Sequence, residues 1–286
     1  MRPTASALLA VSAIIVLTPT YQANASLTLV GSGNVLGPNL VVNGSFETGS
    51  PASGSANNAF WANPSSTPYS PIPGWIGTGP TDNYAVWGSD ETSGPFHLRG
   101  SDIIPAGVTA AYFGNGLFRS VDLPPTFNPD YTVSFSGTPT FGGMNYTGPV
   151  TLSQTVPTQL NPAPLYGLSF WVSGEDANTS PATTPGIFGL RVLNTESGDP
   201  FHYLVVPPGA SSSFGVSHIF RFEFSPLNSS QPVTLEFYNF GHTGYSFAQT
   251  EIVLDDVRLA TIPEPASLNL LALGIFLWLR RKRVIG

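Results

Sequence analysis

Residues 168–173 read LSFWVS, and this stretch decides the fold class. Leu168, Phe170 and Val172 alternate with two serines and with Trp171. Strict alternation of large apolar residues with other residues is the pattern of a β-strand that has one buried and one exposed face. The stretch therefore predicts an antiparallel strand rather than a helix.

The same alternation recurs along the chain, at residues 188–193 (FGLRVL), 219–224 (IFRFEF) and 233–238 (VTLEFY). Further strands are expected at residues 40–42, 84–87, 110–113, 131–135, 150–155, 201–206 and 252–259. Clusters of Pro, Gly, Ser and Asn separate these runs, and residues 50–73 and 117–148 are expected to be a loop and an insertion. About a dozen short strands predict an all-β domain of two packed sheets.

Composition limits the function further. The chain has no cysteine, which excludes thiol catalysis and cysteine-ligated zinc. Without its two ends it keeps five Lys/Arg, none of them lysine, against sixteen Asp/Glu, a net charge of about −11. Such a chain has no basic patch to displace counterions, so we expect no nucleic-acid partner.

The N-terminal end has the pattern of a secretory signal peptide. Arg2 precedes an apolar run at residues 5–17, and Ala23-Asn24-Ala25 is a small-x-small cleavage site. We expect cleavage after Ala25, which makes residues 1–25 the signal peptide.

The C-terminal end reads Pro263-Glu264-Pro265, then an apolar run at residues 266–279, then the basic tail RRKR at 280–283. A basic block after an apolar segment stays cytoplasmic, so the body of the chain lies outside. An ordinary single-pass anchor is the alternative, although 14 residues fall short of the roughly 20 that a stable helical span needs.

This tripartite end resembles the PEP-CTERM sorting signal of exported proteins in Gram-negative bacteria. The resemblance implies processing by an exosortase near Pro263, Glu264 and Pro265. It also implies export by the secretion machinery, a transient inner-membrane tether, and delivery to the cell surface or extracellular matrix.

The body resembles the galactose-binding-like jelly rolls, which include many carbohydrate-binding modules. The resemblance rests on NLVVNGSFE at 39–47, PGW at 73–75, LSQTV at 152–156, YGLSFWV at 166–172 and IVLDDVRL at 252–259. The expected organisation is a lead-in at 26–38, a jelly-roll β-sandwich at 39–260 with an insertion around 117–148, and the sorting signal at 261–286.

That resemblance also implies a structural calcium ion where the first and last strands meet, held by Glu47 with Asp255 or Asp256. Calcium takes six to eight oxygen ligands, which carboxylates and turn carbonyls supply. Alternation along the last strand predicts that Asp255 points towards the site and Asp256 away from it. The alternative is that these acids cap strand ends in water.

No catalytic constellation is recognisable, and we expect a protein that is not an enzyme. The four histidines lack metal-ligand spacing, and the chain has no Gly-x-Ser-x-Gly elbow. Trp171, Arg191, Glu236 and Tyr238 all fall on the polar sides of their strands, and neighbouring strands would gather them on one exposed face. That face would bind glycan, unless the insertion covers Trp171 and makes it a second core layer.

Three functions therefore remain open. The first is an exported, non-enzymatic surface or matrix protein that binds exopolysaccharide. The second is a secreted hydrolase that degrades glycan, and the third is a structural matrix protein without a ligand.

Overall fold

The computed structural model describes residues 26–48, 72–78, 85–89, 109–113, 120–121, 123–142, 150–162, 164–176, 186–206, 218–242 and 250–263. The compact unit Asn24–Pro263 contains every strand that the structure describes, together with the hydrophobic core. Ala25, Glu264, Pro265, the apolar run and the basic tail lie outside the described residues. In the described ranges no helix is long and apolar enough to cross a membrane.

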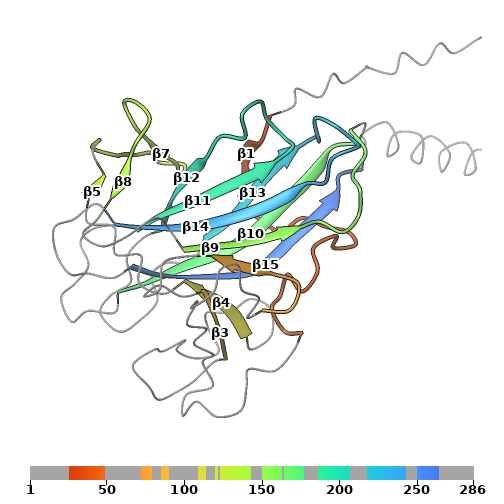
Figure 1. The fold of residues 1–286 in the computed structure, drawn as a ribbon, viewed down its shortest axis with the longest axis horizontal. Coiled ribbons are helices and arrows are strands. Elements are labelled where there is room, and N and C mark those ends of the chain that lie inside the picture. The colour runs from red at the N-terminus through yellow and green to blue at the C-terminus, as the bar shows by residue number, and fades with distance from the viewer. Residues whose placement is uncertain are drawn as a thin grey trace, which may run out of the picture. The chain divides into compact units, whose positions relative to one another are not determined.

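Two antiparallel sheets make up the body, which confirms the predicted all-β sandwich (Figure 1). The six-stranded sheet runs, in spatial order, β1 (Thr28–Gly31), β13 (His218–Phe224), β10 (Tyr166–Asp176), β15 (Thr250–Thr261), β4 (Thr109–Phe113) and β3 (Ala85–Ser89). The five-stranded sheet runs β12 (His202–Val206), β11 (Gly186–Leu193), β14 (Thr234–His242), β9 (Val150–Thr155) and β2 (Ile76–Thr78). From β9 onward the chain crosses repeatedly between the sheets, which is the connectivity of a jelly roll.

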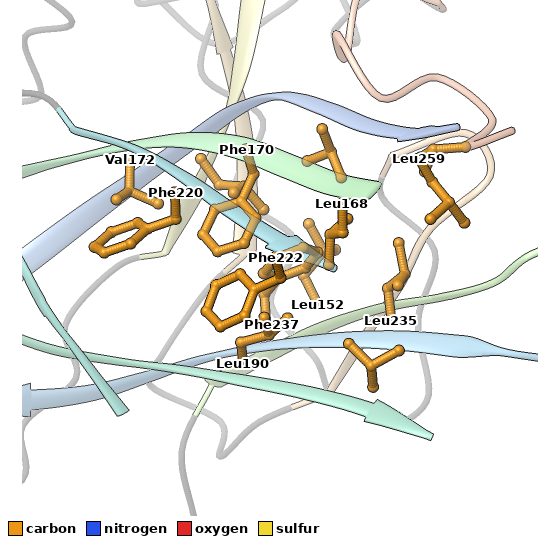
Figure 2. Close-up of a cluster of buried hydrophobic side chains, with 14 of the residues drawn as sticks. Leu152, Leu168, Phe170, Val172, Leu190, Phe220, Phe222, Leu235, Phe237 and Leu259 are labelled. Carbon is orange, nitrogen blue, oxygen red and sulfur yellow. The ribbon is translucent and has the colours of Figure 1, made fainter. Parts of the chain in front are cut away.

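The core lies between the two sheets and is built by the alternating residues. Leu168, Phe170 and Val172 of β10 are fully or almost fully buried, as their alternation predicts. They meet side chains of the opposite sheet, and the rings of Phe170 and Phe237 lie 5.1 Å apart, edge to face (Figure 2). Trp75 is completely buried in the same cluster.

The described part of the insertion meets the five-stranded sheet at β12, through an isolated bridge between Thr132 and Leu204. It contains β5 (Ser120–Val121) paired with β8 (Phe141–Gly142), and β6 (Thr126–Phe127) paired with β7 (Val133–Ser134). The Val205 amide donates to the Tyr131 carbonyl at 2.7 Å, and the Tyr131 ring stacks on His218 of the other sheet at 4.2 Å. Tyr131 thus contacts both sheets at this edge of the sandwich. Its backbone is left-handed (φ 65°), so the strand predicted at 131–135 begins only at Val133.

The segment before β2 lies along β15 without becoming a strand. Leu40 donates to the Leu259 carbonyl, but a turn with Asn43 at φ 51° follows at once, so the strand predicted at 40–42 is wrong. The Asn39 side chain donates to the Val257 carbonyl at 2.9 Å and accepts from the Leu259 amide at 2.9 Å. We call residues 34–44 the lead-in clamp, because they hold the last strand along much of its length.

Candidate functional site

The outward side chains of the five-stranded sheet lie in straight rows across its strands. Strand register places Arg191, Glu236, Ser153 and Ile76 opposite one another on four adjacent strands. Neighbouring strands are about 4.8 Å apart, so this row is about 14 Å long. We call it the polar row.

Arg191, Glu236 and Tyr238 form one hydrogen-bonded network in and beside the polar row. Arg191 Nε donates to Glu236 Oε2 at 2.6 Å, and Tyr238 Oη donates to the same oxygen at 2.6 Å. Arg191 Nη2 donates in turn to Tyr238 Oη at 2.9 Å. The three groups hold one another in place, and such mutual support gives a rigid polar surface.

Burial raises the pKa of Tyr238, and its hydrogen bond to the Glu236 carboxylate adds to the shift. The phenol is therefore a stable donor at every physiological pH. Its proton is committed to Glu236 Oε2, and this fixes where the other carboxylate oxygen points.

Two polar groups of the network remain available to a ligand. Within the described residues, neither Glu236 Oε1 nor Arg191 Nη1 has a hydrogen-bond partner. Both side chains are partly exposed, with 30% of Arg191 and 15% of Glu236 accessible to solvent. The face therefore presents an acceptor beside a charged donor.

An aromatic cluster borders the network. The Arg191 guanidinium lies 4.8 Å from the Phe201 ring centre, and the Phe201 ring packs against Tyr203 at 5.9 Å. Phe201 and Tyr203 are only partly buried, and Phe135 of the insertion packs edge-on against Tyr203 at 5.2 Å, so Phe201 is the ring of the cluster that a ligand beside Arg191 would meet. Phe240 completes the cluster by lying over Gly189, where an added Cβ would come within 2.3 Å of its ring.

The structure brings three of the four predicted glycan-binding residues together and separates the fourth. Arg191, Glu236 and Tyr238 are neighbours because β11 pairs with β14. Trp171 lies on β10 in the other sheet, opposite Asp255, and is only 4% exposed. The expectation that Trp171 shares their exposed face is therefore wrong, since alternation indicates a face of a strand but not the sheet to which the strand belongs.

The sequence did not single out Phe201, Ser153 or Ile76 for this face. Phe201 immediately precedes β12 and is two residues from Tyr203, so the two side chains lie on the same face of the strand. This spacing is a signal that the sequence does contain. Ser153 and Ile76 join the polar row only through the pairing of β9 with β14 and β2, which no local pattern reveals.

The acids of the proposed calcium site lie near the lead-in clamp, but not with the predicted orientations. Strand β15 contains one extra residue relative to β10 between Asp255 and Arg258, and Asp256 is left-handed there (φ 46°). This bulge reverses the alternation, so Asp255 lies on the side of Trp171 while Leu254 and Val257 both enter the core. Both acids are buried, which corrects the expectation that Asp256 faces away into solvent.

The three acids differ in their fit to a cation. Asp256 is already engaged, because its Oδ1 accepts from Arg258 Nε at 2.7 Å and its Oδ2 from Asn34 Nδ2 at 2.8 Å. Asp255 Oδ1 accepts the Asp256 amide at 2.6 Å. Glu47 is exposed, three residues after Gly44, whose carbonyl binds the Val257 amide. Among the described residues no group of three or more His, Cys, Asp or Glu side chains could hold a metal, so any site here needs backbone carbonyls.

The predicted processing motif begins at the edge of the described fold. Strand β15 ends at Thr261, and the Ile262 amide donates to the Leu165 carbonyl at 2.8 Å. Pro263 therefore directly follows Ile262, the last of the described residues that bonds to the sandwich through its backbone.

Comparison with known proteins identifies no family. No protein-family description matches the sequence, and no curated protein matches it. Among solved structures, the Stig cyclase Fisc from Fischerella sp. TAU is 16% identical, with 82% of this chain and 99% of that chain covered and a TM-score of 0.43. TmCBM61, solved with β-1,4-galactotriose, is 14% identical over 79% of this chain and 100% of its own, with a TM-score of 0.39.

The enzymatically active domain of bacteriophage CBA120 tailspike protein 4 is a further neighbour, at 15% identity and a TM-score of 0.37. The match covers 78% of this chain but only 21% of the tailspike chain. Identities and scores of this size carry no information on function.

Proposed function

We propose that this chain is an exported, non-enzymatic protein that binds a glycan on the outer face of its five-stranded sheet. The observation that carries the proposal is the Arg191–Glu236–Tyr238 network, held in register with Ser153 and bordered by a partly exposed ring at Phe201.

The chemistry of the network suits a sugar. A carboxylate oxygen accepts from a hydroxyl and a guanidinium donates to one, so Glu236 Oε1 and Arg191 Nη1 together match two neighbouring hydroxyls of a pyranose. Ring faces of sugars are apolar, and the Phe201 ring beside Arg191 offers them a flat surface. The length of the polar row, about 14 Å, favours an oligosaccharide over a single sugar.

Binding without hydrolysis is the better-supported mode. Glycoside hydrolysis uses two carboxylates on either side of the scissile bond. The strands of this sheet contain one acidic residue, Glu236, and its carboxylate is already paired with Arg191.

A matched pair of variants tests the face. Arg221 and Glu223 form a similar surface ion pair at 2.9 Å on the other sheet, so they control for charge and stability. We expect Glu236→Gln to weaken retention on an exopolysaccharide affinity gel at least tenfold and Glu223→Gln to leave it unchanged. Equal retention of both variants would refute the proposed face.

Two assays separate the rival functions. Binding on a glycan array distinguishes this proposal from a ligand-free matrix protein. Release of reducing sugar from the bound polysaccharide would favour the hydrolase instead, and would place the chemistry outside the network.

Export and sorting are the second half of the proposal. They rest on the terminal motifs, with cleavage after Ala25 and near Pro263, Glu264 and Pro265, and an exosortase as the processing partner. Intact-mass measurement on protein from the native envelope tests both ends. A steady-state species that retains residues 280–283 would refute sorting and favour a plain anchor.

We also propose a structural calcium ion between the turn at Glu47 and the start of the bulge at Asp255. The Gly44–Val257 hydrogen bond supports it, because it joins the two segments that carry these carboxylates. Asp256 is left out of the ligand set, since Arg258 already neutralises it.

A further inference from the structure

Glu196, in the turn between β11 and β12, is a shielded carboxylate with an incomplete set of partners. Only 16% of its side chain is exposed. In the described part of the chain its partners are the backbone amide of Leu27, which donates to Oε1, and the imidazole of His202, whose Nε2 lies 3.4 Å from the same oxygen. Neither partner is a permanent cation.

His202 does not supply the missing charge at neutral pH. Burial lowers the pKa of its imidazole, and the neighbouring Glu196 only partly opposes that shift. Asp199 lies in the same turn as Glu196, and its Oδ1 accepts the Asn194 amide at 3.0 Å. On the neighbouring strands the charged groups are Glu223, which lies opposite Thr28, and Arg221, which is already paired with Glu223. A carboxylate that is largely withdrawn from water therefore faces no free cation among the described residues.

The position of Leu27 brings the backbone nitrogen of Ser26 close to this carboxylate. Successive backbone nitrogens are separated by three covalent bonds and lie less than about 4 Å apart. With Leu27 N hydrogen-bonded to Glu196, the Ser26 nitrogen is within about 7 Å of the carboxylate. Leu27 is 4% exposed and belongs to the core cluster, so this segment is held firmly.

We propose that Glu196 is the docking site for the α-ammonium group that cleavage after Ala25 creates on Ser26. The inference rests on the processing half of the proposed function. In the precursor the Ser26 nitrogen is a neutral amide. In the mature chain it is a cation beside a carboxylate that lacks one, so processing itself tightens the attachment of edge strand β1.

The pairing has a defined pH signature. An opposite charge favours the protonated amine, so its pKa in the folded protein rises above the ordinary value of about 7.7–8.0. The stability that the pair adds is complete below the unfolded value and disappears as pH rises through the folded one.

The absence of lysine from residues 26–263 means that no other aliphatic amine competes with the terminal one for an amine reagent. The only lysine of the chain is Lys282, so a protein spanning residues 26–263 has a single aliphatic amine, at Ser26. The rate at which acetic anhydride labels it, followed by mass spectrometry across pH, reports its pKa directly. We expect a value about one unit above the ordinary one.

Two substitutions decide the assignment. Glu196→Gln keeps an oxygen acceptor for Leu27 and removes only the charge, so the amine should return to its ordinary pKa. Glu223→Gln, the matched control, should leave the raised pKa in place. An ordinary pKa in the unmutated protein, or an equal shift in both variants, would overturn the proposal.

Melting provides a second readout. Protein with a free Ser26 amine should melt higher than the Ser26-acetylated protein at pH 7, and the two should coincide at pH 10. Because the terminus is prepared in the laboratory, this outcome is independent of export. A native mature chain that begins at another residue would overturn the processing step, whereas an unshifted amine would overturn the pairing.

Discussion

Gly44→Ala probes the junction between the lead-in clamp and the last strand. A Cβ at this position would lie 2.0 Å from the Val257 carbonyl oxygen, which is a backbone atom and cannot turn aside. An ordinary carbon–oxygen contact is about 3.3 Å, so the clamp and β15 would have to separate by about 1 Å. That movement breaks the hydrogen bond from the Val257 amide to the Gly44 carbonyl, now 2.8 Å, and strains the bond from Asn39 to Val257.

Losing one such hydrogen bond and leaving buried groups unpaired costs about 3 kcal/mol. For a domain of this size that lowers the melting temperature by roughly 6–12 °C. Gly137→Ala is the control, because Gly137 is exposed and its nearest neighbour is the flexible end of Leu123 at 3.3 Å. Urea unfolding of the 26–263 protein measures both variants. A Gly44→Ala protein within 0.5 kcal/mol of the parent, or an equal loss in Gly137→Ala, would refute the reasoning.

Three further outcomes are expected. Millimolar calcium should raise the melting temperature above its value in chelator, by the equivalent of about 2.7 kcal/mol at a hundredfold excess over Kd. The shift should vanish in Glu47→Ala and in Asp255→Ala. An equal shift with magnesium would mean that calcium only screens the negative charge of the domain. Phe237→Ala should cost about 3–5 kcal/mol in urea unfolding, because the ring contacts Trp75 and Phe170 in the core. Burial raises the pKa of Tyr203 and Tyr238 in the folded protein, so the unfolded chain ionises these two phenols first and stability should fall as pH rises above about 10. Melting measured across pH should show a shallower fall in Tyr238→Phe.

Local pattern predicted the strands but not their partners. Alternation placed Leu168, Phe170 and Val172 in the core because a strand exposes its two faces to different surroundings. The same reasoning failed at Asp255, where one extra residue at Asp256 reverses the parity. Such a bulge is set by contacts with another strand and leaves no local signal.

On the candidate face, too, alternation predicted which side of a strand is polar but not which strands are neighbours. The polar sides of β11 and β14 were readable from the sequence, and their pairing brings Arg191 and Glu236 within 2.6 Å. Trp171 also falls on the polar side of its strand, but that strand, β10, belongs to the other sheet. Strand order is a property of the whole chain, so no alternation within one strand could separate these cases.

The lead-in clamp has a consequence for the order in which the chain folds. Asn39 bonds to Val257 and Leu259, partners that are 218 and 220 residues further along the chain. A ribosome or translocation pore that delivers the chain from its N-terminus releases the clamp almost first and β15 last. Until β15 emerges, β10 lacks its neighbour and the clamp lacks its partner, so the two edges they would cover remain open. Closure of so distant a contact is slow, and the newly delivered chain passes through a period in which aggregation competes with folding.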